Sequence, residues 1–329
     1  MKLRIGSRGS QLALWQANHI AALLRGQGHA VEIEIIRTTG DKLQEITFAQ
    51  VGSKGMFTKE IEEALAEGRV DLAVHSLKDL PTELPEPFVL AATPARVDPR
   101  DVFVSVKHAN LAALPDGARV GTSSQRRRAQ LKALRPGIEA VEFRGNVDTR
   151  LRKLSQGQVD AILLAAAGLD RLGHAELVRE RLDPTDFCPA AGQGALGIET
   201  RKDDLATISA VAFLDDPSTR FAVTAERAAL AALGGGCQVP IGVHCRRRAC
   251  GLQVPVSRPG MEDDRSANQE DALEIFAVVA APESGSAIRI HHVVAQSETD
   301  PEDLGRFAAK MLFEAGAGPL LASAAGAAK

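Results

Sequence analysis

Residues 70–81 read VDLAVHSLKDLP, a short apolar strand that runs directly into histidine, serine, lysine and aspartate. Before it, apolar runs such as LRIG and VEIEIIR alternate with helix-period segments such as LALWQANHIAALL and FTKEIEEALAEG. This alternation over residues 2–95 predicts a βαβα unit with a mostly parallel sheet. Ligands of such sheets collect at the carboxyl ends of strands, so the residues that follow strands are the first candidates for a site.

A second series of the same plan follows the proline-containing stretch ATPARVDPRD at residues 92–101. It contains VFVSV, ARVGTSSQRRRAQLKAL and DAILLAAAGLDRL, again with strand and helix patterns alternating. After Pro217 the order changes to a long helix, strand-like segments near 239–246, 273–281 and 287–295, and a final helix over 301–315. This last part predicts a small α+β unit. The polar stretch at 257–271 reads as a solvated loop.

The composition is that of an ordinary globular protein, with 45% hydrophobic and 25% charged residues in 329, enough for two or three domains. A net charge of -3 gives no general attraction to nucleic acid or to an anionic membrane. The N-terminus lacks a signal-peptide core and no apolar run is long enough to span a bilayer, so we expect a cytoplasmic protein. Its four cysteines, Cys188, Cys237, Cys245 and Cys250, are then expected to be reduced thiols.

Asp79 is the candidate catalyst, because it lies with Lys78, His75 and Ser76 immediately after the apolar strand. A carboxylate there can accept a proton or stabilise a developing positive charge. The alternative is that Asp79 caps a turn and Lys78 is solvated, which is the commoner role of an isolated Lys-Asp pair.

The second candidate is GGGCQVPIG at residues 234–242, where glycines leave the Cys237 thiol unshielded between a helix and a strand. An exposed thiol can serve as a nucleophile or as an attachment point. The alternatives are a buried structural cysteine or a metal ligand together with His244, Cys245 and Cys250. The spacing matches no compact zinc knuckle, so no metal is predicted.

Several arginines and hydroxyls at expected strand ends and helix starts form the third candidate. Backbone N–H groups and the helix dipole favour an anion at a helix N-terminus, and arginine adds bidentate recognition of carboxylate. The members are Arg8, Thr122, Ser123, Ser124, Arg126, Arg127, Arg144 and Arg150. Any single arginine can instead coat an exposed helix face.

Lys54 and Lys59 flank GMFT in a long loop between residues 38 and 59, where they can close over an acidic ligand or remain solvated. Trp15 falls on the apolar spacing Leu12, Trp15, His19 and Leu23 of the first expected helix. This spacing predicts that Trp15 packs in the core.

Taken in order, ten segments resemble the porphobilinogen deaminase family over nearly the whole chain. They are IGSRGSQLALWQA, GSKGMFTKE, HSLKDLP, DPRDVFVS, VGTSSQRRRAQL, RGNVDTRLRKL, DAILLAAAGL, PAAGQGALGIE, VTAERA and GGGCQVPIG. So many ordered matches make this resemblance highly specific.

The resemblance implies two doubly wound α/β domains like those of periplasmic binding proteins, followed by a small α+β domain. Domain 1 would comprise residues 1–95 with 195–213, because the chain of this family returns to its first domain. Domain 2 would comprise 96–194, and domain 3, which presents the cysteine, 214–329. The family also implies a monomer, and the net charge and apolar patterning lead us to expect no nucleic-acid or membrane partner.

The resemblance further implies a transferase that condenses four porphobilinogen molecules, with loss of ammonia, into a linear tetrapyrrole. The primer would be a dipyrromethane cofactor joined to Cys237 by a thioether, and Asp79 would be the catalytic residue. Cofactor contacts would come from Lys78, Thr122, Ser123, Ser124, Arg126, Arg127, Arg144, Gly145 and Gln193. Substrate contacts would come from Arg8, Ser10, Lys54, Lys59, Ser76, Arg144 and Arg150.

Two other classes of protein compete with this interpretation. A non-enzymatic bilobal receptor for a small acidic ligand would use the same two α/β units, but would have no use for HSLKDLP together with GGGCQVPIG. An RNA-binding protein that uses Arg126 to Arg128 would need a basic face and aromatic platforms. The aromatic content of 4% and the absence of tyrosine argue against that class.

Overall fold

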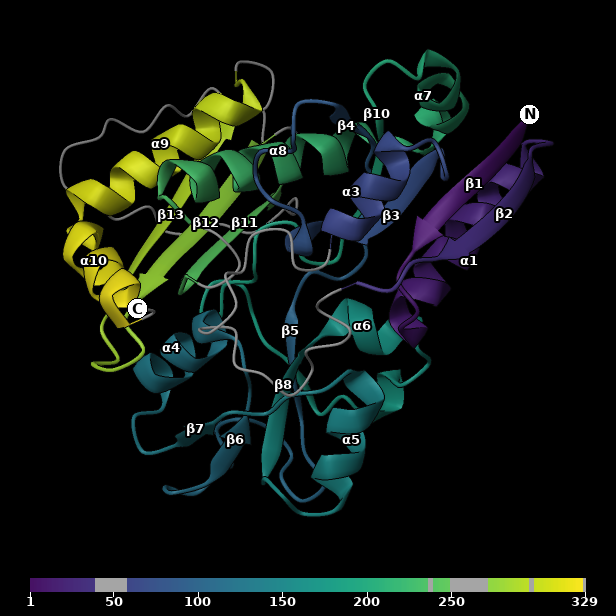
Figure 1. Cartoon of the computed structure of the whole chain (residues 1–329). Helices are drawn as coiled ribbons and strands as arrows, with labels where there is room; N and C mark the ends of the chain where they lie inside the picture. Colours follow the sequence, from purple (N-terminus) through teal and green to yellow (C-terminus); the bar gives the residue numbers. More distant parts are fainter. Residues whose placement is uncertain (39–57, 236–238, 249–271, 296–298, 328–329) are drawn as a thin grey trace.

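The computed structural model describes residues 1–38, 58–235, 239–248, 272–295 and 299–327. Within these ranges the chain forms three sheets with helices packed against them (Figure 1). Four features singled out in the sequence lie outside the described residues: Lys54 with its loop, Cys237, Cys250 and the polar stretch 257–271.

The first sheet has the strand order β2-β1-β3-β10-β4. Its strands are β1 Lys2–Ser7, β2 Ala30–Ile35, β3 Leu72–Ser76, β4 Phe88–Ala92 and β10 Leu196–Arg201. Strands β1, β2 and β3 are parallel, whereas β10 runs antiparallel to both β3 and β4. The sheet is therefore mostly parallel, as predicted, and its one reversed strand comes from far along the chain.

Helices cover both faces of this sheet. On one face α1 (Gln11–Gly26) buries Ala17, Ile20 and Leu24 against β1 and β3, beside residues of α7 (Leu205–Val211). On the other face α3 (Lys59–Ala66) buries its own apolar side. This arrangement confirms a doubly wound unit.

The prediction that Trp15 belongs to the core is wrong. Its side chain is 37% exposed and stacks on His19, with ring centroids 5.1 Å apart. The buried face of α1 lies about one residue further round the helix, where Ala17 and Ala21 let the helix approach the sheet closely. Large apolar residues on several faces of α1 concealed this face in the sequence.

The second sheet repeats the plan with the order β7-β6-β8-β5-β9. Its strands are β5 Asp101–Val104, β6 Arg119–Gly121, β7 Glu139–Val141, β8 Ala161–Ala165 and β9 Glu180–Arg181. Its helices are α4 Gln125–Leu134, α5 Val147–Ser155 and α6 Ala166–Arg171. Core residues of α4 pack on one face, and those of α5 and α6 on the other. Here β5 is the reversed strand.

The third unit is an antiparallel sheet of β11 (Ile241–Arg247), β12 (Ala272–Ala280) and β13 (Ala287–Ala295). One face is covered by α8 (Pro217–Ala232) and α9 (Pro301–Glu314). Both helices begin with Asp-Pro, in which the aspartate caps the backbone N–H groups and proline starts the first turn. A further helix, α10 (Ala317–Ala327), follows α9 and extends beyond the predicted final helix. The predicted fold class is confirmed.

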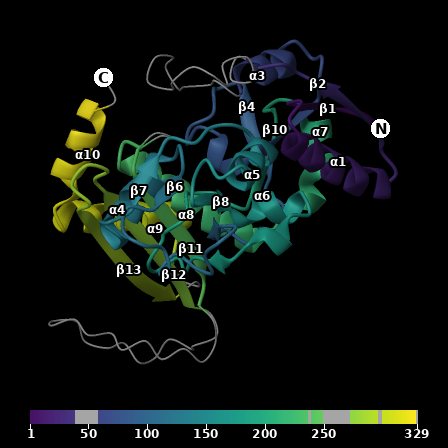
Figure 2. The same cartoon turned by 90° about the horizontal axis from the view of Figure 1, so that it is seen from below.

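The third unit also packs against the second. Phe276 and Val278 on the other face of β12 form a small core with Ala129 of α4 and with Cys188, and α4 lies beside this sheet in Figure 2. None of the helices in the described ranges combines the length and apolarity needed to cross a membrane.

Candidate active site

Asp79 lies at the end of a 3-10 turn (Leu77–Asp79) that continues directly from β3. The turn is anchored by Leu77, whose side chain is 1% exposed and whose N–H donates to the carbonyl of Ala195 at 3.0 Å. Leu80 is buried as well, whereas the side chain of Asp79 is exposed. The local fold therefore presents this carboxylate to solvent beyond the carboxyl end of the central strand.

Lys78 precedes Asp79 and is partly buried, with its Nζ 3.4 Å from Gln193 Oε1. Burial, together with the charges of Arg127 and Arg126, lowers the pKa of Lys78 to about 8, against the attraction of Asp79 and Asp101. The ammonium group thus stands among cations that lie on the second unit.

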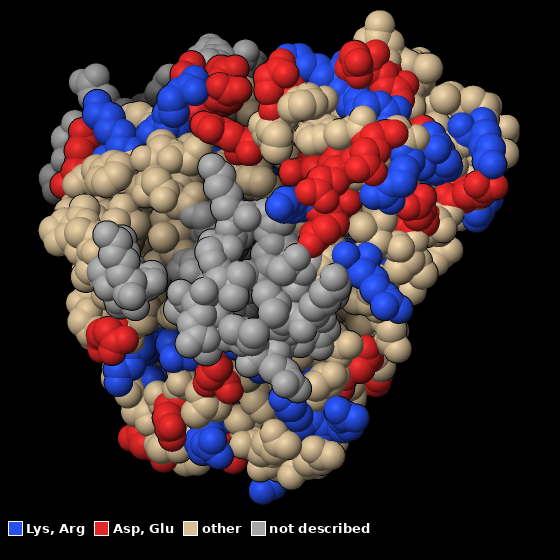
Figure 3. Space-filling model, in the orientation of Figure 1, with Lys and Arg blue, Asp and Glu red and all other residues tan. Residues whose placement is uncertain are grey.

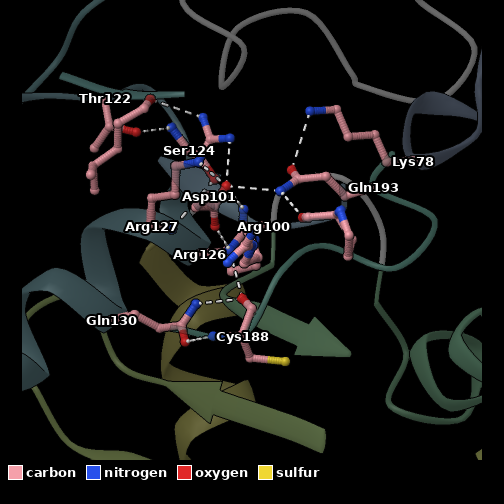
Figure 4. Close-up of polar contacts among 12 residues, drawn as sticks. Lys78, Arg100, Asp101, Thr122, Ser124, Arg126, Arg127, Gln130, Cys188 and Gln193 are labelled. Atoms are coloured by element: carbon pink, nitrogen blue, oxygen red, sulfur yellow. Dashed lines mark hydrogen bonds and ion pairs between the residues drawn. The ribbon is translucent and has the colours of Figure 1, made fainter. Parts of the chain in front are cut away.

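Arg126 and Arg127 converge on one buried carboxylate, that of Asp101 at the start of β5 (Figure 4). Arg126 Nη1 is 2.6 Å from Asp101 Oδ2, and Arg127 Nη2 is 2.7 Å from Asp101 Oδ1. Ser124 caps α4 by accepting from the N–H of Arg127 at 3.4 Å, which sets both arginines in the first turn of the helix. Both arginines are buried, so they do not coat an exposed helix face.

Asp101 was not singled out in the sequence. Burial by itself would raise the pKa of this carboxyl, but the charges of Arg126 and Arg127 outweigh it and hold the pKa well below its ordinary value. The available signal was an acidic residue at the first position of the apolar strand DVFV, directly after ATPARVDPR. An acidic residue in a polar stretch is ordinarily predicted to be exposed to solvent.

Gln193 joins these groups to the first unit. Its Nε2 donates to Asp101 Oδ1 at 2.9 Å and to the carbonyl of Pro99 at 2.7 Å, while its Oε1 faces Lys78. Gly194 beside it has a φ of +89°, and a Cβ there would stand 2.6 Å from the carbonyl oxygen of Val97. The two segments that cross between the units therefore touch at this glycine.

A second group of predicted residues lies at the start of α5. Arg150 Nη2 donates to Ser123 Oγ at 3.1 Å. Burial lowers the pKa of Arg150 to about 10, helped by the charges of Arg127 and Arg144, and its Nε is buried with no hydrogen-bond partner among the described residues. Gly145 has a φ of +118°, and a Cβ there would stand 2.7 Å from Thr149.

The remaining predicted residues have local contacts. Ser10 caps α1 by accepting from the N–H of Ala13 at 3.3 Å, and Ser76 Oγ accepts from Gln16 Nε2 at 2.8 Å. Thr122 Oγ1 accepts from the N–H of Ser124 and Arg144 Nε donates to Glu142. Lys59 starts α3, is exposed, and has its Nζ 3.9 Å from Glu63. Arg8 is half-buried between β1 and α1.

Two cysteines lie within the described residues, and both are buried. Burial raises the pKa of Cys188 to about 12 and also raises that of Cys245, so neither thiol is poised to react. In the part of the chain that the structure describes, no group of three or more histidine, cysteine, aspartate or glutamate side chains is arranged to hold a metal. Cys237 and Cys250, which belong with His244 and Cys245 to the metal-ligand alternative, lie outside the described residues.

The comparisons with known proteins agree across the chain. Residues 3–209 match the family model described as porphobilinogen deaminase, dipyromethane cofactor binding domain, and residues 220–314 match the porphobilinogen deaminase C-terminal domain. The chain belongs to the porphobilinogen deaminase family. Its function is the transferase reaction of this family in tetrapyrrole biosynthesis, and the bilobal receptor is not favoured.

Curated porphobilinogen deaminases are close relatives of the chain. One from Nitratidesulfovibrio vulgaris is 56% identical over 74% of this chain and 77% of its own length. One from Chromobacterium violaceum is 45% identical over 98% of this chain and 97% of its own length. Among solved structures, a putative methionine-binding lipoprotein from Bacillus subtilis aligns at 14% identity and a TM-score of 0.41, covering 66% of this chain and 92% of its own.

Proposed function

We propose that the chain condenses four porphobilinogen molecules head to tail, with loss of ammonia, on a dipyrromethane primer carried by Cys237, and that Asp79 is the catalytic carboxylate. The observation that supports this assignment most directly is the position of Asp79. Its exposed side chain follows the central strand β3, next to Lys78 and within electrostatic reach of Arg127.

The reaction needs a group that orients the pyrrole ring and stabilises the positive charge that develops on it, and a carboxylate can do both. Asp79 accepts the pyrrole N–H of the substrate and thereby orients the ring. As the amine leaves, positive charge develops on the pyrrole, and a fixed negative group close to the ring stabilises it. The same carboxylate can take up or supply a proton at the leaving amine.

The neighbouring cations suit the carboxylates of the substrate. Porphobilinogen carries an acetate and a propionate, so each added unit brings two negative charges and requires several donors. Lys78, Arg126, Arg127 and Arg150 supply positive charge from two units, and Asp79, Asp101 and Glu142 offset part of it. We assign Arg8, Ser10, Lys54, Lys59, Ser76 and Arg144 to the substrate as well.

The donor set also fits the family's cofactor. Arg150 has a buried Nε without a partner among the described residues, and the amide of Gln193 lies between Lys78 and Asp101. We assign the cofactor to Cys237, with contacts from Lys78, Thr122, Ser123, Ser124, Arg126, Arg127, Arg144, Gly145 and Gln193. When bound, a dipyrromethane supplies the pyrrole carbon that is extended, and its tether keeps the growing product at the site.

Replacement of Asp79 tests the catalytic assignment. Asp79→Asn should lower kcat by about 10²- to 10⁴-fold, with a smaller change in KM, because the lost interaction develops mainly in the transition state. Glu83→Gln removes an exposed carboxylate four residues further along and should leave both constants unchanged. A folded Asp79→Asn variant that retains the wild-type kcat would refute the assignment.

Intact-protein mass spectrometry tests the attachment. The wild-type protein should carry an excess mass equal to two linked pyrrole units, and brief exposure to porphobilinogen should add a ladder of further pyrrole increments. Cys237→Ala should carry neither, whereas Cys188→Ala should retain both, because Cys188 is buried. A wild-type protein at its bare sequence mass that gains nothing would refute the primer.

The division of the chain forms part of the same proposal. We place domain 1 at residues 1–95 with 195–213, domain 2 at 96–194 and domain 3 at 214–329, with the site between the first two. We also propose a cytoplasmic monomer whose partner is porphobilinogen alone. On the face shown in Figure 3, acidic and basic side chains are interspersed, which is consistent with a protein that binds no nucleic acid.

A further inference from the structure

Asp101 is the common partner of three side chains assigned above to ligand binding. It is fully buried and accepts from Arg126, Arg127 and Gln193 (Figure 4). It is the first residue of β5, directly after the segment that crosses from the first unit to the second. It therefore lies where a crossing segment, the first turn of α4 and the Gln193 turn meet.

We propose that Asp101 is a positioning residue for the reaction: its carboxylate orients Arg126, Arg127 and Gln193 and limits the positive charge that these groups share with Lys78. This inference rests on the proposed function. Asp101 itself is not placed in contact with the substrate.

The contacts fix each guanidinium from two sides. Arg126 Nη1 donates both to Asp101 and to the carbonyl of Cys188 at 2.7 Å. Arg127 donates to Asp101 through Nε and Nη2, and to the carbonyl of Leu163 through Nη1 at 3.1 Å. A guanidinium carries five N–H groups, so each arginine keeps donors beyond these contacts. The direction of those donors is set by Asp101.

The charge balance gives Asp101 a second role. Arg126, Arg127 and Lys78 bring three positive charges close together, and burial together with the repulsion from both arginines lowers the pKa of Lys78. Asp101 and Asp79 oppose that effect. Without the carboxylate of Asp101, the arginines would lose their shared partner and Lys78 would lose its proton at a lower pH.

Asp101→Asn separates this role from a structural one, because the amide has the same shape without the charge. We expect a folded protein whose kcat/KM falls by about 10- to 100-fold, the usual effect of a lost outer contact to a binding group. We also expect the basic limb of its pH–rate profile to move to lower pH. The control Asp98→Asn removes a carboxylate of the same segment that pairs with Arg100 and Arg181 instead of with Arg126 and Arg127, and should change neither quantity.

A second measurement does not depend on activity. In a Cys237→Ser protein, the pH dependence of Lys78 methylation by formaldehyde and a hydride donor, followed by peptide mass spectrometry, reports the proton affinity of its amine. Asp101→Asn should shift this titration to lower pH. An unshifted titration, or a wild-type kcat/KM and pH profile, would overturn the proposal.

If Asp101→Asn does not fold, Asp101→Glu keeps the charge and moves it by one methylene. For this variant we expect a lower kcat/KM, while Lys78 titrates near the pH found for the wild type. A wild-type kcat/KM would overturn the proposal. The variants of Asp79 and Asp101 distinguish the two proposals. An active Asp79→Asn variant counts against the proposed function, whereas an inactive Asp79→Asn with an unaltered Asp101→Asn counts only against Asp101.

Discussion

Arg96 and Glu226 form a two-pronged buried ion pair, with Arg96 Nη1 2.6 Å from Glu226 Oε1 and Nη2 3.1 Å from Oε2. Arg96 belongs to the first crossing segment, and Glu226 to α8 of the third unit. Glu226 also accepts from the N–H of Gly192, in the second crossing segment, at 2.7 Å. The helix that leads toward Cys237 is thus bonded to both segments that join the first two units.

Removing the charge of Glu226 should destabilise the folded protein. Glu226→Gln leaves Arg96 buried without a charged partner, so we expect a loss of about 3 to 5 kcal/mol in the free energy of unfolding. Urea denaturation followed by circular dichroism measures it. Glu302→Gln, which removes an exposed partner of Arg306 on α9, serves as the control and should leave the midpoint unchanged.

The Arg96–Glu226 ion pair also predicts that the stability of the protein depends on pH. Burial would raise the pKa of Glu226, but the charges of Arg96 and His244 outweigh it and lower the pKa to about 2. The contribution of Glu226 is therefore complete above its ordinary pKa of about 4.3 and is lost as the pH falls toward 2. Unfolding midpoints between pH 5 and pH 2 should decline less steeply in Glu226→Gln than in the wild type. Equal slopes would contradict this account.

Gly194 should tolerate no side chain. Its φ of +89° disfavours other residues, and a Cβ would stand 2.6 Å from the carbonyl oxygen of Val97. We expect Gly194→Ala to cost about 2 to 5 kcal/mol, through backbone strain and overpacking together. Gly68→Ala adds a Cβ at a φ of +68° with no atom within 4 Å, so it should show the strain alone, about 1 kcal/mol. Comparable losses in the two variants would show that the close approach is unimportant.

The buried cysteines should resist alkylation. With its pKa raised to about 12 by burial, Cys188 carries almost no thiolate at pH 8, and Cys245 is buried as deeply. Iodoacetamide followed by peptide mapping should therefore label both residues only after denaturation. Labelling of Cys188 in the native protein at the rate of a small thiol would contradict its placement between α4 and β12.

Trp15 offers a probe of the contact between the first two units. The Arg171 guanidinium of α6 lies 5.8 Å from its ring centroid and donates to the carbonyl of Gly194 at 2.8 Å. Since the chain has a single tryptophan, Arg171→Met should shift the emission of Trp15 alone. Arg152→Met, at an exposed position of α5, should not shift it. Identical spectra for the two variants would argue against the contact.

The periodic segments were predictable because each buries its own apolar face. The strand that ends at Ser76 and the helix that follows Ser124 both lie where hydrophobic spacing and capping residues indicated. Asp101 was not predictable, because its partners are Arg126 and Gln193, and only the folded chain brings these together. The place of β10 was likewise invisible to local pattern and came only from the family resemblance.

The position of β10 in the first sheet has a consequence for how the protein folds during synthesis. Leu196 pairs with Ser76, so the strand that lies between β3 and β4 is synthesised only after the whole second unit. On the ribosome, the first sheet therefore stays incomplete, without the strand that pairs with both β3 and β4, while the second unit can already fold. We therefore expect nascent chains that stop before Leu196 to depend on chaperones, and the order of domain folding to run opposite to the order of translation at this junction.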